Sequence, residues 1–215
     1  IALNNLGQGA EQMGEIETAR LCYEESAAVC QEIGDQIGEA YATSNLAGIA
    51  MLNNDLPLAH TLYSASFRIF HRSDDLRSTS IALRNLSEID LQLGNYRAAR
   101  QQLLESLTIT QQLEDLRGIA YCIIGLTRVL HQQALAPNTP QATWQTLVRW
   151  IATAQTIQAQ NGFVFEGEIA NKITDILQAA QTQLSPANFQ SVNTSGSQLT
   201  IEQIIAEIST QPETP

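Results

Sequence analysis

A spacing of forty residues recurs through the first 130 residues of this chain and constrains its fold more than any other feature. Leucine, asparagine, alanine, serine and aspartate each recur at this spacing in a register of their own. The positions are Leu6, Leu46, Leu86 and Leu126; Asn5, Asn45 and Asn85; Ala19, Ala59 and Ala99; Ser26, Ser66 and Ser106; and Asp35, Asp75 and Asp115. Several registers held at one spacing indicate a repeat architecture, in which each unit buries its apolar face against its neighbours.

Each repeat is predicted to contain two helices. Asp35, Asp75 and Asp115 stand where a side-chain oxygen can cap the N–H groups of the first helix, and apolar residues then recur at helical spacing. The first helices are predicted to end at Gly14, Asn54 and Gly94, residue types that tolerate a left-handed helix stop. Second helices are predicted over residues 16–33, 56–72 and 96–113, where the small Ala19, Ala59 and Ala99 allow close packing.

The residues of these repeats resemble the tetratricopeptide (TPR) family. Leu6-Gly7, Gly14, Ala19 and Tyr23 follow its pattern best, and later copies are looser. A period of forty residues, instead of the usual thirty-four, resembles the variant found in large bacterial signalling proteins. The resemblance implies an all-α fold, a right-handed TPR-like superhelix of antiparallel helix pairs with a C-terminal helical cap.

The repeat register breaks after Leu130, and the chain divides accordingly. We expect three full TPR-like units and the first helix of a fourth over 1–134, followed by an inserted loop with two prolines over 135–142. The second helix of the fourth unit and the capping helices are expected over 143–209, and a frayed tail over 210–215. The predicted cap helices are 143–160, 165–184, 186–190 and 199–209, with a polar turn over 191–197. Trp150 is expected in the core, and Trp144 is the candidate for an exposed contact surface.

A second resemblance lies near the end of the chain. Leu184–Phe189, a polar turn and Leu199–Ile205 resemble the tail of the TPR region that closes bacterial STAND-type (NB-ARC-like ATPase) transcriptional regulators. Ser185 stands where that family usually has Gly, and the 135–142 loop is extra. Because the chain starts with Ile1 in what reads as the middle of a helix, we expect it to be a piece of a longer protein with further repeats upstream. The resemblance implies an upstream nucleotide switch and an output domain.

Composition excludes several classes of function. The chain has 215 residues, 11 Lys and Arg against 22 Asp and Glu, and a net charge of −11. Phosphate backbones require clustered cations, so direct nucleic-acid contact is not expected. No apolar run approaches the ~20 residues that span a bilayer, and no membrane contact is expected. The three cysteines have no paired spacing, which favours reduced, buried thiols and a cytoplasmic location.

No motif in the sequence indicates catalysis. The run from Gly9 to Gly14 has P-loop glycine spacing but lacks the Lys and Ser/Thr that hold phosphate and Mg²⁺. His60, His71 and His131 lie in separate predicted helices without partners at metal-ligand spacing. We therefore predict no catalytic residues, no metal and no cofactor.

The TPR resemblance places the first helices along a concave groove. By repeat register the groove residues are Asn4, Gln8, Tyr41, Ser44, Asn45, Arg84, Asn85, Glu88, Tyr121 and Arg128. Such a lining suits a protein or an extended peptide, with amides contacting its backbone and arginines its carboxylates. Alternatively, Asn5, Asn45 and Asn85 satisfy neighbouring helix backbone inside the stack. The only lysine, Lys172, lies outside the repeats, which speaks against a chaperone adaptor.

These observations predict a non-catalytic binding module, the sensor or interaction arm of a multidomain bacterial regulator. A free-standing peptide receptor or scaffold is an alternative, and an oligomerisation domain is another. The oligomeric state cannot be read from the sequence.

Overall fold

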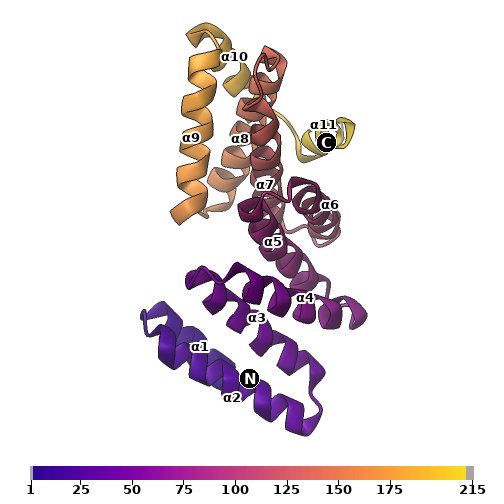
Figure 1. Cartoon of the computed structure of the whole chain (residues 1–215). Coiled ribbons are helices and arrows are strands. Elements are labelled where there is room, and N and C mark those ends of the chain that lie inside the picture. The colour runs from indigo at the N-terminus through magenta and orange to yellow at the C-terminus, as the bar shows by residue number, and fades with distance from the viewer. Residues whose placement is uncertain (1, 212–215) are drawn as a thin grey trace. The chain divides into compact units, whose positions relative to one another are not determined.

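The structure is a computed structural model that describes residues 2–211, and all regular elements in that range are helices (Figure 1). The predicted all-α class is therefore confirmed. By their internal contacts the residues divide into two compact units, which we call unit 1 (Ile1–Ile89) and unit 2 (Asp90–Pro215). The division falls inside one long helix and does not coincide with the end of a repeat.

Unit 1 consists of successive helix pairs joined by short turns. Its helices are α1 (Ala2–Gln12), α2 (Ile16–Ile33), α3 (Gln36–Leu52), α4 (Leu56–Arg72) and most of α5 (Leu76–Leu93). Turns of two or three residues make sequential helices antiparallel neighbours, and α1, α2, α3 and α4 pack in this order. The helix pairs predicted from the repeat register are confirmed.

The turns of unit 1 contain the helix caps and the left-handed helix stop that the sequence predicts. The carboxylates of Asp35 and Asp75 accept hydrogen bonds from the backbone N–H groups of Gly38 and Ser78, at 2.9 and 3.0 Å. Asn54 has a φ of +58°, in the left-handed region. Asn adopts this conformation more readily than most residues because its side chain is short and polar. The predicted caps and helix stop are confirmed.

The interior of unit 1 combines small alanines with a few large side chains such as Tyr23 and Phe70. Ala19 and Ala59 are fully buried, at 0% exposure, and they let the paired helices approach closely. Tyr23 fills the space beside Gly7, where an added Cβ would lie 2.5 Å from the tyrosine ring. Any larger residue than glycine would therefore displace Tyr23. The buried residues form separate small clusters, because each repeat reaches only its neighbours.

Unit 2 surrounds one continuous core. Its helices are the end of α5, α6 (Tyr96–Gln112), α7 (Leu116–Ala134), α8 (Gln141–Asn161), α9 (Gly167–Gln183), α10 (Pro186–Ser197) and α11 (Ile201–Thr210). Figure 1 shows α9 and α11 on opposite sides of α7 and α8. Every residue of α7 from Cys122 to Leu130 is buried, and large aliphatic side chains such as Leu147 and Ile151 of α8 complete the cluster.

Helix α11 is fastened to α8 by one carboxylate. Glu207 accepts hydrogen bonds from Arg149 Nε and Nη2 at 3.0 and 2.7 Å, and from the indole N–H of Trp150 at 3.0 Å. Below this contact Ile204 and Ile208 are buried in the core. Thr200 and Gln203 form a capping box that fixes where α11 begins.

Two details of the predicted cap are wrong. Residues 191–197 are not a turn but the second half of α10, which continues to Ser197 because Val192 and Gly196 pack into the core and give the helix a buried face. Trp144 is only 5% exposed and packs edge-on against His131, with ring centroids 5.9 Å apart. It therefore offers no contact surface. Trp150 is buried as predicted, and so are all three cysteines, which are free thiols.

Candidate binding surfaces

Eight of the ten predicted groove residues lie in unit 1, on α1, α3 and α5. These residues are Asn4, Gln8, Tyr41, Ser44, Asn45, Arg84, Asn85 and Glu88. Gln8 and Tyr41 are exposed, and the others are half-buried. First helices therefore carry polar side chains that retain access to solvent, while alanines of the same helices face the interior. That the eight form one binding surface stays a prediction.

Tyr41 has a structural task that the sequence did not reveal. Its hydroxyl donates to Asp75 at 2.7 Å and accepts from Ser78 at 2.9 Å, which ties α3 to the first turn of α5. Its ring packs against Phe70 with centroids 5.0 Å apart. Burial alone would raise the pKa of Asp75, but the hydrogen bonds from Tyr41 and Ser78 outweigh it and hold this pKa below its usual value. Only the exposed part of the Tyr41 ring can contact a ligand.

The asparagine series behaves differently. Within the described residues, the side chains of Asn5, Asn45 and Asn85 make no hydrogen bond to the protein, although Asn45 and Asn85 are half-buried. The alternative that these amides satisfy neighbouring helix backbone therefore finds no support in the observed contacts. Each amide retains two donors and an acceptor for another molecule.

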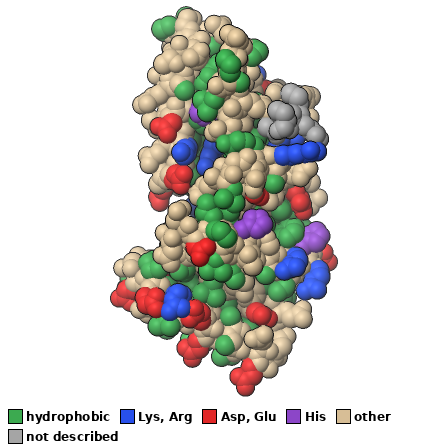
Figure 2. Space-filling model, viewed as in Figure 1, with side chains coloured by type: hydrophobic (Ala, Val, Ile, Leu, Met, Phe, Trp, Pro, Cys, Tyr) green, Lys and Arg blue, Asp and Glu red, His purple; other side chains and the backbone are tan. Residues whose placement is uncertain are grey.

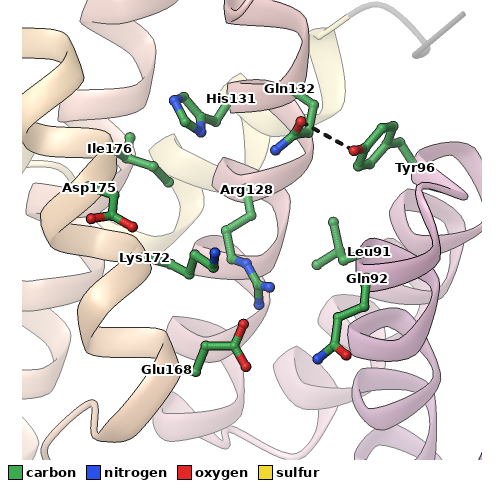
Figure 3. A pocket seen from close by; sticks show the side chains of 10 residues that line it. All are labelled: Leu91, Gln92, Tyr96, Arg128, His131, Gln132, Glu168, Lys172, Asp175 and Ile176. Carbon is green, nitrogen blue, oxygen red and sulfur yellow. Dashed lines mark hydrogen bonds between the residues drawn. The ribbon is translucent and has the colours of Figure 1, made fainter. Parts of the chain in front are cut away.

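Unit 2 contains a cleft of about 200 Å³ between α5, α7 and α9. One wall is formed by Leu91, Gln92 and Tyr96, and the other by Glu168, Lys172, Asp175 and Ile176 of α9, with Arg128, His131 and Gln132 of α7 between them (Figure 3). In this view the ammonium of Lys172 and the guanidinium of Arg128 point toward one another, and the Glu168 carboxylate lies beside the guanidinium. The Tyr96 hydroxyl donates to the Gln132 side-chain oxygen at 3.2 Å, which joins α6 to α7.

His131 is the half-buried polar group of this cleft. Its Nε2 atom is buried and has no hydrogen-bond partner among the described residues. Burial lowers the pKa of His131; nearby Asp175 opposes this shift and Lys172 adds to it. The imidazole is therefore neutral near pH 7 and leaves one buried ring nitrogen unsatisfied, a cost that a ligand atom or a water molecule would remove.

The two remaining predicted groove residues have different surroundings. Arg128 lines the cleft, although it is only 9% exposed. Tyr121 lies among the rings of Phe163 and Phe165, at centroid distances of 6.3 and 5.2 Å, and the guanidinium of Arg117 lies 5.8 Å from its ring. Tyr121 thus packs against the segment that leads into α9 and does not line the cleft.

Sequence reasoning missed the contribution of α9 to the cleft. Glu168, Lys172 and Asp175 are spaced i, i+4 and i+7, which places them on one face of a helix. This spacing could have been noticed in the sequence, but nothing in the sequence indicated that α9 lies against the face of α7 that carries Arg128 and His131.

The described residues show neither a metal site nor a membrane-spanning element. No group of three or more His, Cys, Asp or Glu side chains in residues 2–211 is arranged to hold a metal ion. Within the same range no helix combines the length and the apolar character needed to cross a bilayer.

A family comparison supports the repeat assignment in part of the chain. Residues 38–112 match the family model of the tetratricopeptide repeat, which covers the second and third repeats. No curated protein matches the chain. Two solved structures of nearly identical TPR-like repeats, from a protein described as a kinesin light chain of Podosopora anserina, are similar to it. One is a glutamine-to-methionine variant with 16% identity and a TM-score of 0.48, covering 85% of this chain and 94% of that one. The other has 15% identity and a TM-score of 0.48, with 86% and 96% covered.

TPR repeats are, in general, protein-binding modules, and residues 38–112 of this chain are similar to them. The partner and the larger protein context belong to the proposal below.

Proposed function

We propose that this chain is a non-catalytic module that binds a protein or an extended peptide through the polar faces of its first helices. The observation that carries the proposal is the pair Asn45 and Asn85, which occupy equivalent repeat positions inside the matched TPR segment. Both amides are half-buried and make no hydrogen bond within the described residues. Neither amide has a fully buried polar atom without a partner, so both can exchange hydrogen bonds with water for hydrogen bonds with a ligand.

An extended peptide offers what these amides lack. Its backbone presents one N–H and one C=O per residue, and an asparagine side chain can contact both. Arg84 and Glu88, one turn apart on α5, supply charges of both signs to recognise side chains of the partner. With a net charge of −11 the chain attracts basic partners over a distance, an effect that rises as ionic strength falls.

The test begins with a peptide selected from a random library against the full chain, and its affinity is then compared among variants. We expect Asn45→Ala and Asn85→Ala each to weaken binding about tenfold, the equivalent of one or two lost hydrogen bonds. Arg84→Ala should also weaken it, whereas Arg68→Ala on α4, a second helix, should not. Equal losses from Arg84→Ala and Arg68→Ala would contradict the groove assignment.

For the wider context, we propose the sensor or interaction arm of a bacterial transcriptional or signalling regulator in the cytoplasm. Support comes from the tail resemblance at Leu184–Phe189 and Leu199–Ile205 and from the buried free thiols, which suit a reducing compartment. Sequencing the reading frame upstream of Ile1 tests this. A P-loop domain with a DNA-binding motif supports the regulator, whereas further repeats alone would favour a free-standing receptor or scaffold.

The oligomerisation alternative has a separate test. The chain exposes large apolar side chains on unit 1, including Leu6, Met13 and Ile33, and such residues can form an interface between copies. Analytical ultracentrifugation over a wide concentration range decides the matter, because a persistent monomer would remove this alternative.

A further inference from the structure

The cleft of unit 2 is lined by three charged side chains of α9 that do not pair with one another. On α9, Glu168, Lys172 and Asp175 are spaced for i, i+4 and i, i+3 ion pairs. Among the described residues, however, none of the three makes an ion pair within 4.0 Å. All three line the same cavity of about 200 Å³, and Figure 2 shows acidic, basic and histidine side chains gathered over this part of unit 2. These charges therefore face a common space and remain available to an occupant.

The balance of charge in the cleft restricts that occupant. Two cations, Arg128 and Lys172, and two carboxylates, Glu168 and Asp175, line it, so its formal charge is zero while His131 is neutral. A purely anionic ligand would meet two like charges, and so would a purely cationic one, and like-charge contacts oppose binding. A ligand that carries one charge of each sign meets an opposite charge for both of its groups.

The size of the cleft restricts the occupant further. Drug-sized ligands occupy pockets of roughly 300–1,000 Å³, so a cavity of about 200 Å³ suits a smaller molecule. Leu91 offers apolar surface on one wall (Figure 3), whereas Ile176 on the opposite wall is only 1% exposed. The buried Nε2 of His131 lacks a hydrogen-bond partner in the described structure. A charged side chain on the ligand would add a charge that the cleft does not match.

We propose that this cleft is a binding site for a small zwitterion of the α-amino acid type with an uncharged side chain. Its carboxylate contacts Lys172 and Arg128, and its ammonium contacts the carboxylates of Glu168 and Asp175. The guanidinium of Arg128 has five donors, so it can serve a ligand together with other partners. The side chain of the ligand lies against Leu91. This site is independent of the proposed protein-binding function, and either can fail without the other.

The first experiment is isothermal titration calorimetry of the full chain with each of the twenty free amino acids. We expect at least one uncharged amino acid to bind with a Kd of about 1 mM or lower, which is typical of a small ligand with a few polar contacts. The N-acetyl derivative of that amino acid keeps only the negative charge of the carboxylate. The amino acid amide, in which the carboxylate is replaced by a carboxamide, keeps only the positive charge of the ammonium. Both should bind at least about tenfold more weakly.

Matched protein variants locate the site. Lys172→Gln and Asp175→Asn each remove one exposed charge from the cleft and should weaken binding about tenfold. Arg68→Gln and Glu105→Gln remove equivalent exposed charges outside the cleft and should leave the Kd unchanged. All four residues are exposed, so the fold should persist, and circular dichroism melting curves check this.

The single lysine offers an independent readout. Reductive methylation with ¹³C-formaldehyde labels Lys172 and the N-terminal amine, keeps the positive charge, and gives one side-chain signal in an NMR spectrum. The bound amino acid should shift this signal, and its N-acetyl and amide derivatives should not at the same concentration. The proposal is overturned if no amino acid binds, if a singly charged derivative binds as tightly as the zwitterion, or if the variants outside the cleft weaken binding equally.

Discussion

Unit 1 and unit 2 bury their apolar residues in opposite ways. Unit 1 packs alanines such as Ala19, Ala40 and Ala59 in separate small clusters, and most of the exposed large apolar side chains of the described chain lie on it. Unit 2 gathers isoleucines, leucines and both tryptophans in one continuous core. Helix α7 is covered by α6, α8 and α9 and its large apolar side chains are buried, whereas the helices of unit 1 leave many of theirs exposed.

This contrast has a thermodynamic consequence. Each square ångström of apolar surface removed from water contributes about 25 cal/mol, so unit 2 should be the more stable unit. Both tryptophans of the chain lie in unit 2. Tryptophan fluorescence therefore reports unit 2 alone, while circular dichroism reports the helices of both units. Two transitions that do not coincide would show that the units unfold separately.

The largest change in unfolding free energy is expected at a repeat position whose leucine is exposed in unit 1 but buried in unit 2. Leu6 of unit 1 is 59% exposed, whereas Leu126 of unit 2, at the same register position, is 3% exposed. Leu126→Ala leaves a cavity and should lower the free energy of unfolding of unit 2 by about 2–5 kcal/mol. Leu6→Ala should change that of unit 1 by less than ~0.5 kcal/mol. Urea titration followed by fluorescence and by circular dichroism measures both; similar losses would erase the distinction between the units.

The same register shows how far the sequence could predict the fold. The repeated leucines, alanines and aspartates predicted the helix pairs and their caps, and Gly14, Asn54 and Gly94 predicted the helix stops, because these features depend on local sequence. It could not predict how deeply each copy is buried, because burial depends on what packs from outside the repeat. Trp144 illustrates this: its helical position suggested a solvent-facing side, but α7 supplies His131 to cover it.

The two candidate sites also differ in whether the sequence could predict them. The asparagine series could be found from the sequence, because it follows the repeat period. The cleft of unit 2 could not, because Lys172 and Asp175 lie beyond the last repeat and approach Arg128 only through the packing of α9 near α7. A register argument extends only as far as the repeats themselves.

Substitutions at two helical glycines, one in each unit, provide a second test of the difference in packing between unit 1 and unit 2. An added Cβ at Gly196 of α10 would lie 2.5 Å from the backbone oxygen of Arg149 in α8, so the two helices would have to separate. Gly196→Ala should therefore destabilise unit 2 by about 1–3 kcal/mol. Gly9 of α1 has no atom within 4 Å of its added Cβ, and Gly9→Ala should stabilise unit 1 by up to ~1 kcal/mol through helix propensity.

Thermal unfolding monitored by both signals separates these two effects. The fluorescence transition should move to lower temperature for Gly196→Ala, and only the circular dichroism transition should rise for Gly9→Ala. A Gly196→Ala variant with an unchanged fluorescence transition would mean that α10 does not pack closely on α8 in solution.

The smallest change in unfolding free energy is expected for the polar contact between Tyr41 of α3 and the start of α5. Tyr41→Phe removes the hydroxyl that donates to Asp75 and accepts from Ser78. Because the contact is partly exposed, we expect a loss of about 0.5–1.5 kcal/mol in the unfolding free energy of unit 1 near pH 7. Urea titration by circular dichroism measures it, and fluorescence should show unit 2 unchanged.

The pH dependence of this loss identifies its cause. The pKa of Asp75 is lower in the folded chain than in the unfolded chain, so its contribution to stability is complete above the ordinary Asp pKa of about 3.9 and disappears as pH falls through the folded value. Phenylalanine cannot donate to the carboxylate, so the variant should have less of this contribution to lose. The difference between wild type and Tyr41→Phe should therefore narrow as pH falls from about 6 to about 3. A constant difference would mean that the hydroxyl stabilises unit 1 through Ser78 or through ring packing, and not through the ionised carboxylate.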